Sequence, residues 1–99
     1  MGNPRIDSLD TVEMVMAIEE LFEIAIPDRT AEGFGGFREI VDYLDAALTG
    51  KTPNKRADAA LRHLAKTLER PELIPRKGEP WRREQIAAII REIEKTLPE

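Results

Sequence analysis

Residues 7–28 read DSLDTVEMVMAIEELFEIAIPD, and this stretch decides the fold of the first half of the chain. Its apolar residues recur with the period of an α-helix, and Pro27 marks the loop that follows. Successive residues are turned by about 100° on a helix, so one side of the stretch is apolar enough for a core. The residues on that side are Met14, Val15, Ile18, Leu21 and Phe22. We therefore predict a helix from about Ser8 to Glu23.

The opposite side of this predicted helix combines apolar and acidic residues. Three apolar residues, Leu9, Val12 and Met16, share that side with Glu13, Glu19, Glu20 and Glu23. Exposed apolar side chains ringed by charge are typical of a docking surface. The alternative is that C-terminal segments cover Leu9 and Val12.

Ser8 stands at the start of the helix, where a hydroxyl usually serves as an N-cap. A helix N-terminus also offers free N–H groups and a partial positive charge. It therefore tolerates a phosphodiester attached to the serine oxygen.

The rest of the chain also predicts helices, since no useful stretch alternates with the period of a strand. Thr49-Gly50 is typical of the end of a helix, here the second predicted helix. Thr52-Pro53 is typical of an N-cap followed by a proline at the first helical position, so a third helix is expected to begin there and to end before Pro71. Trp81 is expected to anchor a fourth and last helix. The predicted helices after the first span about 36–48, 53–70 and 82–97. We expect an all-α class and one small domain, 1–99.

The composition of the chain excludes several kinds of functional site. The chain of 99 residues has no cysteine, which excludes disulfides, thiolate metal sites and a cysteine nucleophile. It has no apolar run of the roughly 20 residues that span a bilayer and no visible signal peptide, so we expect a cytoplasmic protein. The single histidine, His63, has no neighbours at metal-ligand spacing, and adjacent Glu19 and Glu20 point about 100° apart on a helix. We expect neither an enzyme nor a metal site.

Charge is divided unevenly along the chain. Residues 1–50 hold 3 Lys or Arg and 11 Asp or Glu, whereas residues 51–99 hold 12 and 8. The acidic half argues against nucleic acid as a partner there and favours partners with basic surfaces. It is an equally good interpretation that the acidic and the basic residues simply lie on helix faces exposed to solvent.

Residues 5–48 resemble helices II to IV of an acyl carrier protein. The similar segments run without a gap from Asp7 to Leu44: the DSLD start, Val12-Glu13, IEELF, the IAIPD exit and VDYL. The resemblance implies that Ser8, within the motif Asp7-Ser8-Leu9, carries 4′-phosphopantetheine added from coenzyme A by a phosphopantetheinyl transferase. The thiol of that cofactor would carry an acyl group as a thioester.

The resemblance also implies roles for other residues. Partner-binding positions are Asp10, Val12, Glu13, Met16, Glu19 and Glu20, and acyl-pocket or core positions are Ile18, Phe22, Ile26 and Phe34. The expected partners are the transferase, an acyl-loading enzyme, and acyltransferases or synthases with basic docking surfaces. A specialised lipid pathway, for example lipopolysaccharide modification, or a secondary-metabolite pathway would fit. The alternative is a carrier-derived interaction module that is not modified.

The sequence departs from the family in several places. Arg5 replaces a usual glycine, and Phe34 and Phe37 are bulky enough to narrow a chain-holding cavity or to fill the gap left by a missing helix. The glycines of 33–36 should weaken the short helix III of the family. Only six residues precede the DSL motif, which leaves no room for the family's helix I. We predict that the helix at 82–97 takes its place. The alternative is a helix from a partner or from a second copy of the chain.

Overall fold

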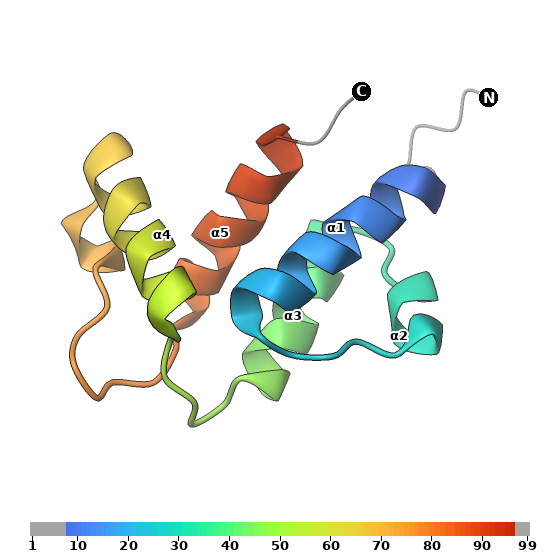
Figure 1. The fold of residues 1–99 in the computed structure, drawn as a ribbon, viewed down its shortest axis with the longest axis horizontal. Helices are drawn as coiled ribbons and strands as arrows, with labels where there is room; N and C mark the ends of the chain where they lie inside the picture. Colours follow the sequence, from blue (N-terminus) through green and yellow to red (C-terminus); the bar gives the residue numbers. More distant parts are fainter. Residues whose placement is uncertain (1–7, 97–99) are drawn as a thin grey trace.

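The structure, a computed structural model, describes residues 8–96, with side chains from residue 12 onward, and within this range it holds helices and no strand (Figure 1). The described residues form five α-helices and one 3₁₀ turn. They are α1 (Ser8–Phe22), α2 (Asp28–Glu32), α3 (Phe37–Ala47), α4 (Lys55–Thr67), the 3₁₀ turn η1 (Pro71–Leu73) and α5 (Arg83–Thr96). The expected all-α class is confirmed.

Two helices end in the same way, with a non-glycine residue in the left-handed region. Glu23 has φ 56° directly after α1, and the N–H of Ile24 donates to the carbonyl of Glu19 at 3.2 Å. Glu69 also has φ 56° after α4, and the N–H of Arg70 donates to the carbonyl of Ala65 at 2.8 Å. These bonds satisfy helix-end carbonyls in the pattern of a Schellman motif, in which glycine is the usual left-handed residue. Both helices therefore end at a position that is strained for glutamate.

The start of α4 differs from the prediction, because Asn54 rather than Thr52 is its N-cap. The Asn54 side-chain oxygen accepts the N–H of Ala57 at 2.8 Å. The same amide donates to the carbonyl of Leu21 at 2.9 Å. A side-chain amide has an acceptor oxygen and separate N–H donors, so both bonds form at once. Asn54 thus ties the start of α4 to the end of α1.

The remaining helix ends lie near the predicted ones. The chain leaves α3 through Gly50, whose φ of 78° favours glycine, as the predicted stop required. Pro71 does not close α4 directly, since α4 ends at Thr67 and Pro71 begins η1. The last helix begins at Arg83, two residues after Trp81.

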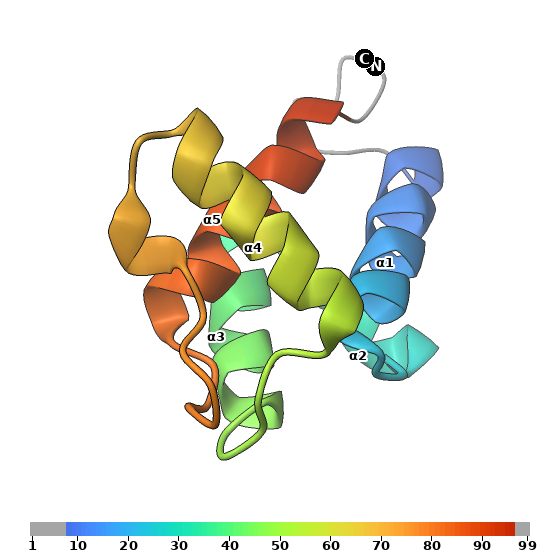
Figure 2. The ribbon, with the colours of Figure 1, turned by 60° about the vertical axis from the view of Figure 1, so that its left-hand side comes forward.

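One hydrophobic cluster joins the helices, and α5 is central to it. α5 contacts α3, α4 and α1, and α4 also contacts α1 (Figures 1 and 2). Burying one large aliphatic side chain stabilises the fold by about 1.5–3 kcal/mol relative to leaving it exposed. The largest fully buried apolar side chains are Ile18, Val41, Leu44, Leu48, Leu61, Leu73, Ile86, Ile89 and Ile90. The last helix thus packs on α1 and α3 of its own chain.

Trp81 anchors the segment that leads into α5, as predicted. Its ring lies against the ring of Phe22, with centroids 4.9 Å apart, and its backbone N–H donates to the carbonyl of Lys51 at 2.8 Å. Both aromatic side chains are buried. The segment before α5 is therefore fixed to the end of α1.

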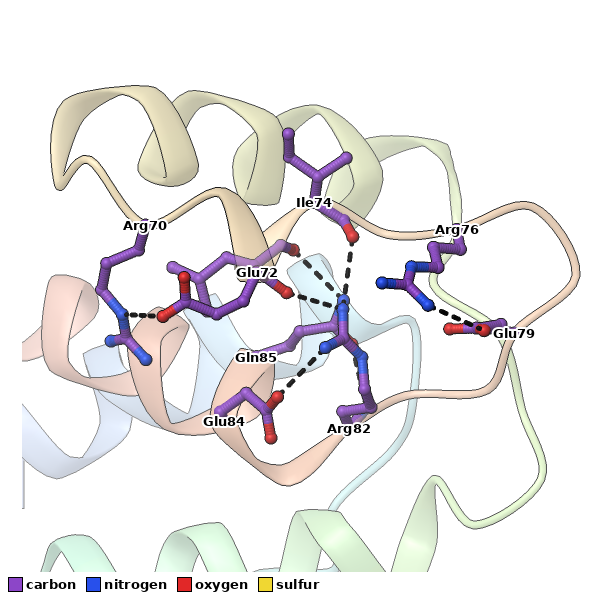
Figure 3. A network of polar contacts seen from close by, with 9 residues as sticks. Arg70, Glu72, Ile74, Arg76, Glu79, Arg82, Glu84 and Gln85 are labelled. Carbon is purple, nitrogen blue, oxygen red and sulfur yellow. Dashed lines mark hydrogen bonds and ion pairs between the residues drawn. The ribbon is translucent and has the colours of Figure 1, made fainter.

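A polar network holds η1 and the loop after it against the start of α5 (Figure 3). The Arg82 guanidinium donates to the carbonyls of Glu72 at 2.7 Å and Ile74 at 3.2 Å. The buried side chain of Gln85 accepts the N–H of Arg82 and donates to the carbonyl of Leu73. In the same network, the hydrogen bond from Arg70 lowers the pKa of Glu72. Backbone groups that the loop could not pair internally are satisfied in this way.

Ion pairs also link α5 to α3. The Arg83 guanidinium lies 2.5 Å from a carboxylate oxygen of Asp42 and 3.5 Å from one of Asp45. The hydrogen bond to Asp42 raises the pKa of Arg83. Part of the basic charge of the second half is thus directed at the acidic first half.

Candidate functional site

Ser8 is the first helical residue of α1. The first N–H groups of an α-helix have no partner within the helix, and the helix dipole is positive there. The backbone position of Ser8 is therefore suited to an attached anion. Asp7 and the side chains of Ser8, Leu9 and Asp10 lie outside the described residues.

The two predicted faces of α1 are both present. Met14, Ile18 and Phe22 are buried, whereas Val12 is 52% and Met16 is 61% exposed. The alternative that C-terminal segments cover Val12 is therefore wrong. Since residues four apart are neighbours on a helix, Val12 and Met16 lie in one row along the outer side of α1.

The carboxylates of α1 have different surroundings. Glu13 is exposed, as is Glu20, whose carboxylate lies 3.7 Å from the guanidinium of Arg56 on α4. Glu19 is half-buried, and its carboxylate accepts the backbone N–H of Ile26 at 2.7 Å. Glu19 therefore holds the loop after α1 in place, a role that the sequence did not reveal.

Arg56 is a further residue that sequence reasoning missed. It lies 36 positions after Glu20 in the sequence, and no local spacing relates the two. The pair forms because Asn54 fixes the start of α4 beside the end of α1. A side-chain amide just before a helix, as at Asn54, was the available signal for that junction.

The predicted acyl-pocket or core residues all lie in or against the core. Ile18, Phe22 and Ile26 are buried. Phe34 is half-buried and meets Tyr43 edge-on, with ring centroids 5.6 Å apart. These four side chains stabilise the fold, and a role in holding an acyl chain stays a prediction.

The glycine-rich loop at 33–36 connects α2 to α3. α2 has only five residues and ends before Gly33. The N–H of Gly35 donates to the Glu39 carboxylate, and a Cβ at position 35 would collide with that carboxylate. A larger residue at position 35 would therefore displace the exposed Glu39 carboxylate from this bond.

Phe37 begins α3, and its ring is covered by the guanidinium of Arg91, which lies 4.2 Å from the ring centroid. This contact is a cation–π interaction.

Within the described residues, no group of histidine, aspartate or glutamate side chains is arranged to hold a metal ion. Across 8–96, none of the helices has both the length and the apolar character needed to cross a membrane. The sole histidine, His63, is exposed on α4.

Comparison with known proteins identifies the N-terminal segment. Residues 5–44, which include α1, α2 and most of α3, match the protein family described as "Phosphopantetheine attachment site". An "Acyl carrier protein" from Prochlorococcus marinus (strain MIT 9515) is 55% identical over 40 residues, which cover 40% of this chain and 50% of that protein. The chain thus spans about half the length of this curated relative. No solved structure matches.

The predicted resemblance to acyl carrier proteins is therefore confirmed for residues 5–44. The matching family also confirms 4′-phosphopantetheine as the expected cofactor. Helices α4 and α5 lie outside the matched residues.

Proposed function

We propose that this chain is an acyl carrier protein that carries an acyl group as a thioester on 4′-phosphopantetheine attached to Ser8. The observation that carries the proposal is the match of residues 5–44 to the attachment-site family, with Ser8 at the first position of α1. Ser8 is also the only serine in the chain. Other enzymes perform the chemistry, and this chain presents the cargo to them.

The structure suits Ser8 for this role through the helix that it begins. The first-turn N–H groups and the positive end of the α1 dipole stabilise the negative charge of a phosphodiester. The cofactor supplies a terminal thiol, and Asp7 and Leu9 complete the modification motif. The contacts of α1 with α4 and α5 hold this helix against the core.

The outer side of α1 is the docking surface for partner enzymes in this proposal. Val12 and Met16 supply exposed apolar area, and Glu13 and Glu20 supply negative charge. Asp10, two positions after Ser8, adds a further carboxylate to the sequence of this helix. Partners with basic surfaces and an apolar socket are complementary to this arrangement.

Helix α5 takes the place of the family's helix I in the proposal, and residues 1–99 act as one carrier domain. Support comes from the contacts of α5 with α1 and α3 and from the single hydrophobic cluster. The pathway is a specialised one, either of lipid synthesis, for example lipopolysaccharide modification, or of a secondary metabolite. The basic extension at 51–83 favours a dedicated set of partners.

Intact mass after incubation with coenzyme A and a promiscuous phosphopantetheinyl transferase tests the proposal. The unmodified chain should gain the mass of one phosphopantetheine, and Ser8→Ala should gain none. Thr11→Ala, which removes the neighbouring hydroxyl of α1, is the matched control and should be modified like the wild type. No gain with several transferases would contradict the proposal and favour an unmodified interaction module.

A further inference from the structure

The exposed row of α1 ends against a cation of α4. Val12, Met16 and Glu20 are spaced four residues apart, so they lie in one row about 12 Å long. Arg56 faces the last of them, with 3.7 Å between the guanidinium and the carboxylate. The surface therefore changes from acidic near Glu13 to mixed charge near Glu20.

We propose that Arg56 is a specificity-determining residue of this docking surface. It weakens the docking of partners that are basic throughout and favours a protein partner with a carboxylate opposite Arg56. Such a partner would also offer a cation to Glu13 and an apolar socket to Val12 and Met16. This inference rests on the proposed docking role of α1 and names the charge pattern of the partner.

The position of Arg56 is fixed by the fold. The Asn54 amide donates to the carbonyl of Leu21 at 2.9 Å and caps α4 through Ala57. The first turn of α4 is therefore held beside the last turn of α1. Arg56 lies in that first turn, so this junction holds its backbone beside the docking surface.

The placement of Arg56 is unfavourable for α4 alone. Lys55 and Arg56 begin the helix, where the dipole disfavours positive charge. Glu20 across the junction offsets part of this cost. The pair is 59% exposed at Arg56 and 74% at Glu20, so it is weak and open to competition from a partner's charges.

Glu19 adds little available negative charge to the docking surface. Its carboxylate is already bonded to the N–H of Ile26, so it is less available to a partner. Glu20 is shared with Arg56. Of the adjacent pair Glu19 and Glu20, neither offers an unshared charge, and Glu13 is left as the exposed carboxylate between Val12 and Met16.

Direct binding to a transferase tests the inference without requiring modification. The Ser8→Ala protein, which cannot be modified, provides the background, and the probe is an immobilised phosphopantetheinyl transferase chosen for a uniformly basic docking surface. Arg56→Glu should lower the Kd about two- to fivefold. Arg62→Glu is the matched control, because Arg62 is an exposed arginine of α4 that pairs with Asp58 within its own helix. It changes the net charge equally and should alter the Kd less.

A neutral pair of variants tests whether Arg56 acts through Glu20. Arg56→Gln should tighten binding, and the gain should shrink when Glu20→Gln is also present. Equal effects of Arg56→Glu and Arg62→Glu would show that only net charge matters and would overturn the inference. Weaker binding by Arg56→Glu, or no binding of the background protein, would overturn it as well. The intact-mass experiment on the wild-type protein, which retains Ser8, tests the carrier function separately.

Discussion

The rings of Trp81 and Phe22 pack against each other at an interplanar angle of 44°, with centroids 4.9 Å apart. This contact joins the segment that matches the attachment-site family to the part of the chain that does not. Aromatic pairs contribute about 0.5–1.5 kcal/mol beyond the area that they bury. The core side of α1 is thus completed by residues far along the sequence.

Trp81→Ala should destabilise the protein by about 3–5 kcal/mol, because it leaves a cavity beside Phe22. Urea unfolding followed by far-UV circular dichroism measures the change. Ile74→Ala, at a side chain that is 38% exposed, should cost much less. Equal losses for the two variants would contradict the packing seen at Trp81.

Deletion of residues 80–99 should abolish cooperative thermal unfolding. The deletion removes Trp81 and the buried side chains of α5, which leaves the apolar faces of α1 and α3 uncovered. A helical remnant of this size lacks a self-sufficient core. Calorimetry checks the result, and an undiminished melting transition would show that α5 is not required.

Glu19→Ala and Glu20→Ala should differ in their effects on stability, although the two residues are adjacent and identical. Loss of Glu19 leaves the N–H of Ile26 without its charged acceptor and should cost about 1–3 kcal/mol. Loss of Glu20 removes only an exposed ion pair and should cost at most about 1 kcal/mol. Denaturant midpoints of the two variants measure the difference. Equal losses for the two variants, or a larger loss for Glu20→Ala, would contradict a structural role of the bond from Glu19 to Ile26.

Glu23→Gly should stabilise the protein by about 1 kcal/mol, because glycine adopts the positive φ of this position without strain. Glu69→Gly should act similarly at the end of α4, away from the docking surface. Melting temperatures measure both. Glu23→Ala and Glu69→Ala keep the strained φ and serve as controls that should not share the gain.

Local patterns in the sequence predicted α1 well, since helical period alone determines which side of it is apolar. Met14, Ile18 and Phe22 are buried and Met16 is exposed, as the pattern required. The position of Trp81 before the last helix also predicted its anchoring role.

Contacts between residues far apart in the chain could not be predicted from the sequence. Thr52 and Asn54 are both suitable N-caps, and the bond from Asn54 to Leu21 decides between them only once α1 and α4 are adjacent. The same adjacency creates the pair of Glu20 with Arg56. For Glu19, the bonding partner is a backbone N–H in a loop, and a sequence does not reveal which carboxylate the loop will meet.

The central position of α5 has a consequence for the order of events during synthesis. A ribosome adds Ile90 only after 81 further residues have followed Ser8. Until then α1 has no α5 to pack against, so the side of α1 that faces the core stays uncovered. In the proposed carrier function, a transferase that recognises folded α1 would attach the cofactor only after α5 has left the exit tunnel.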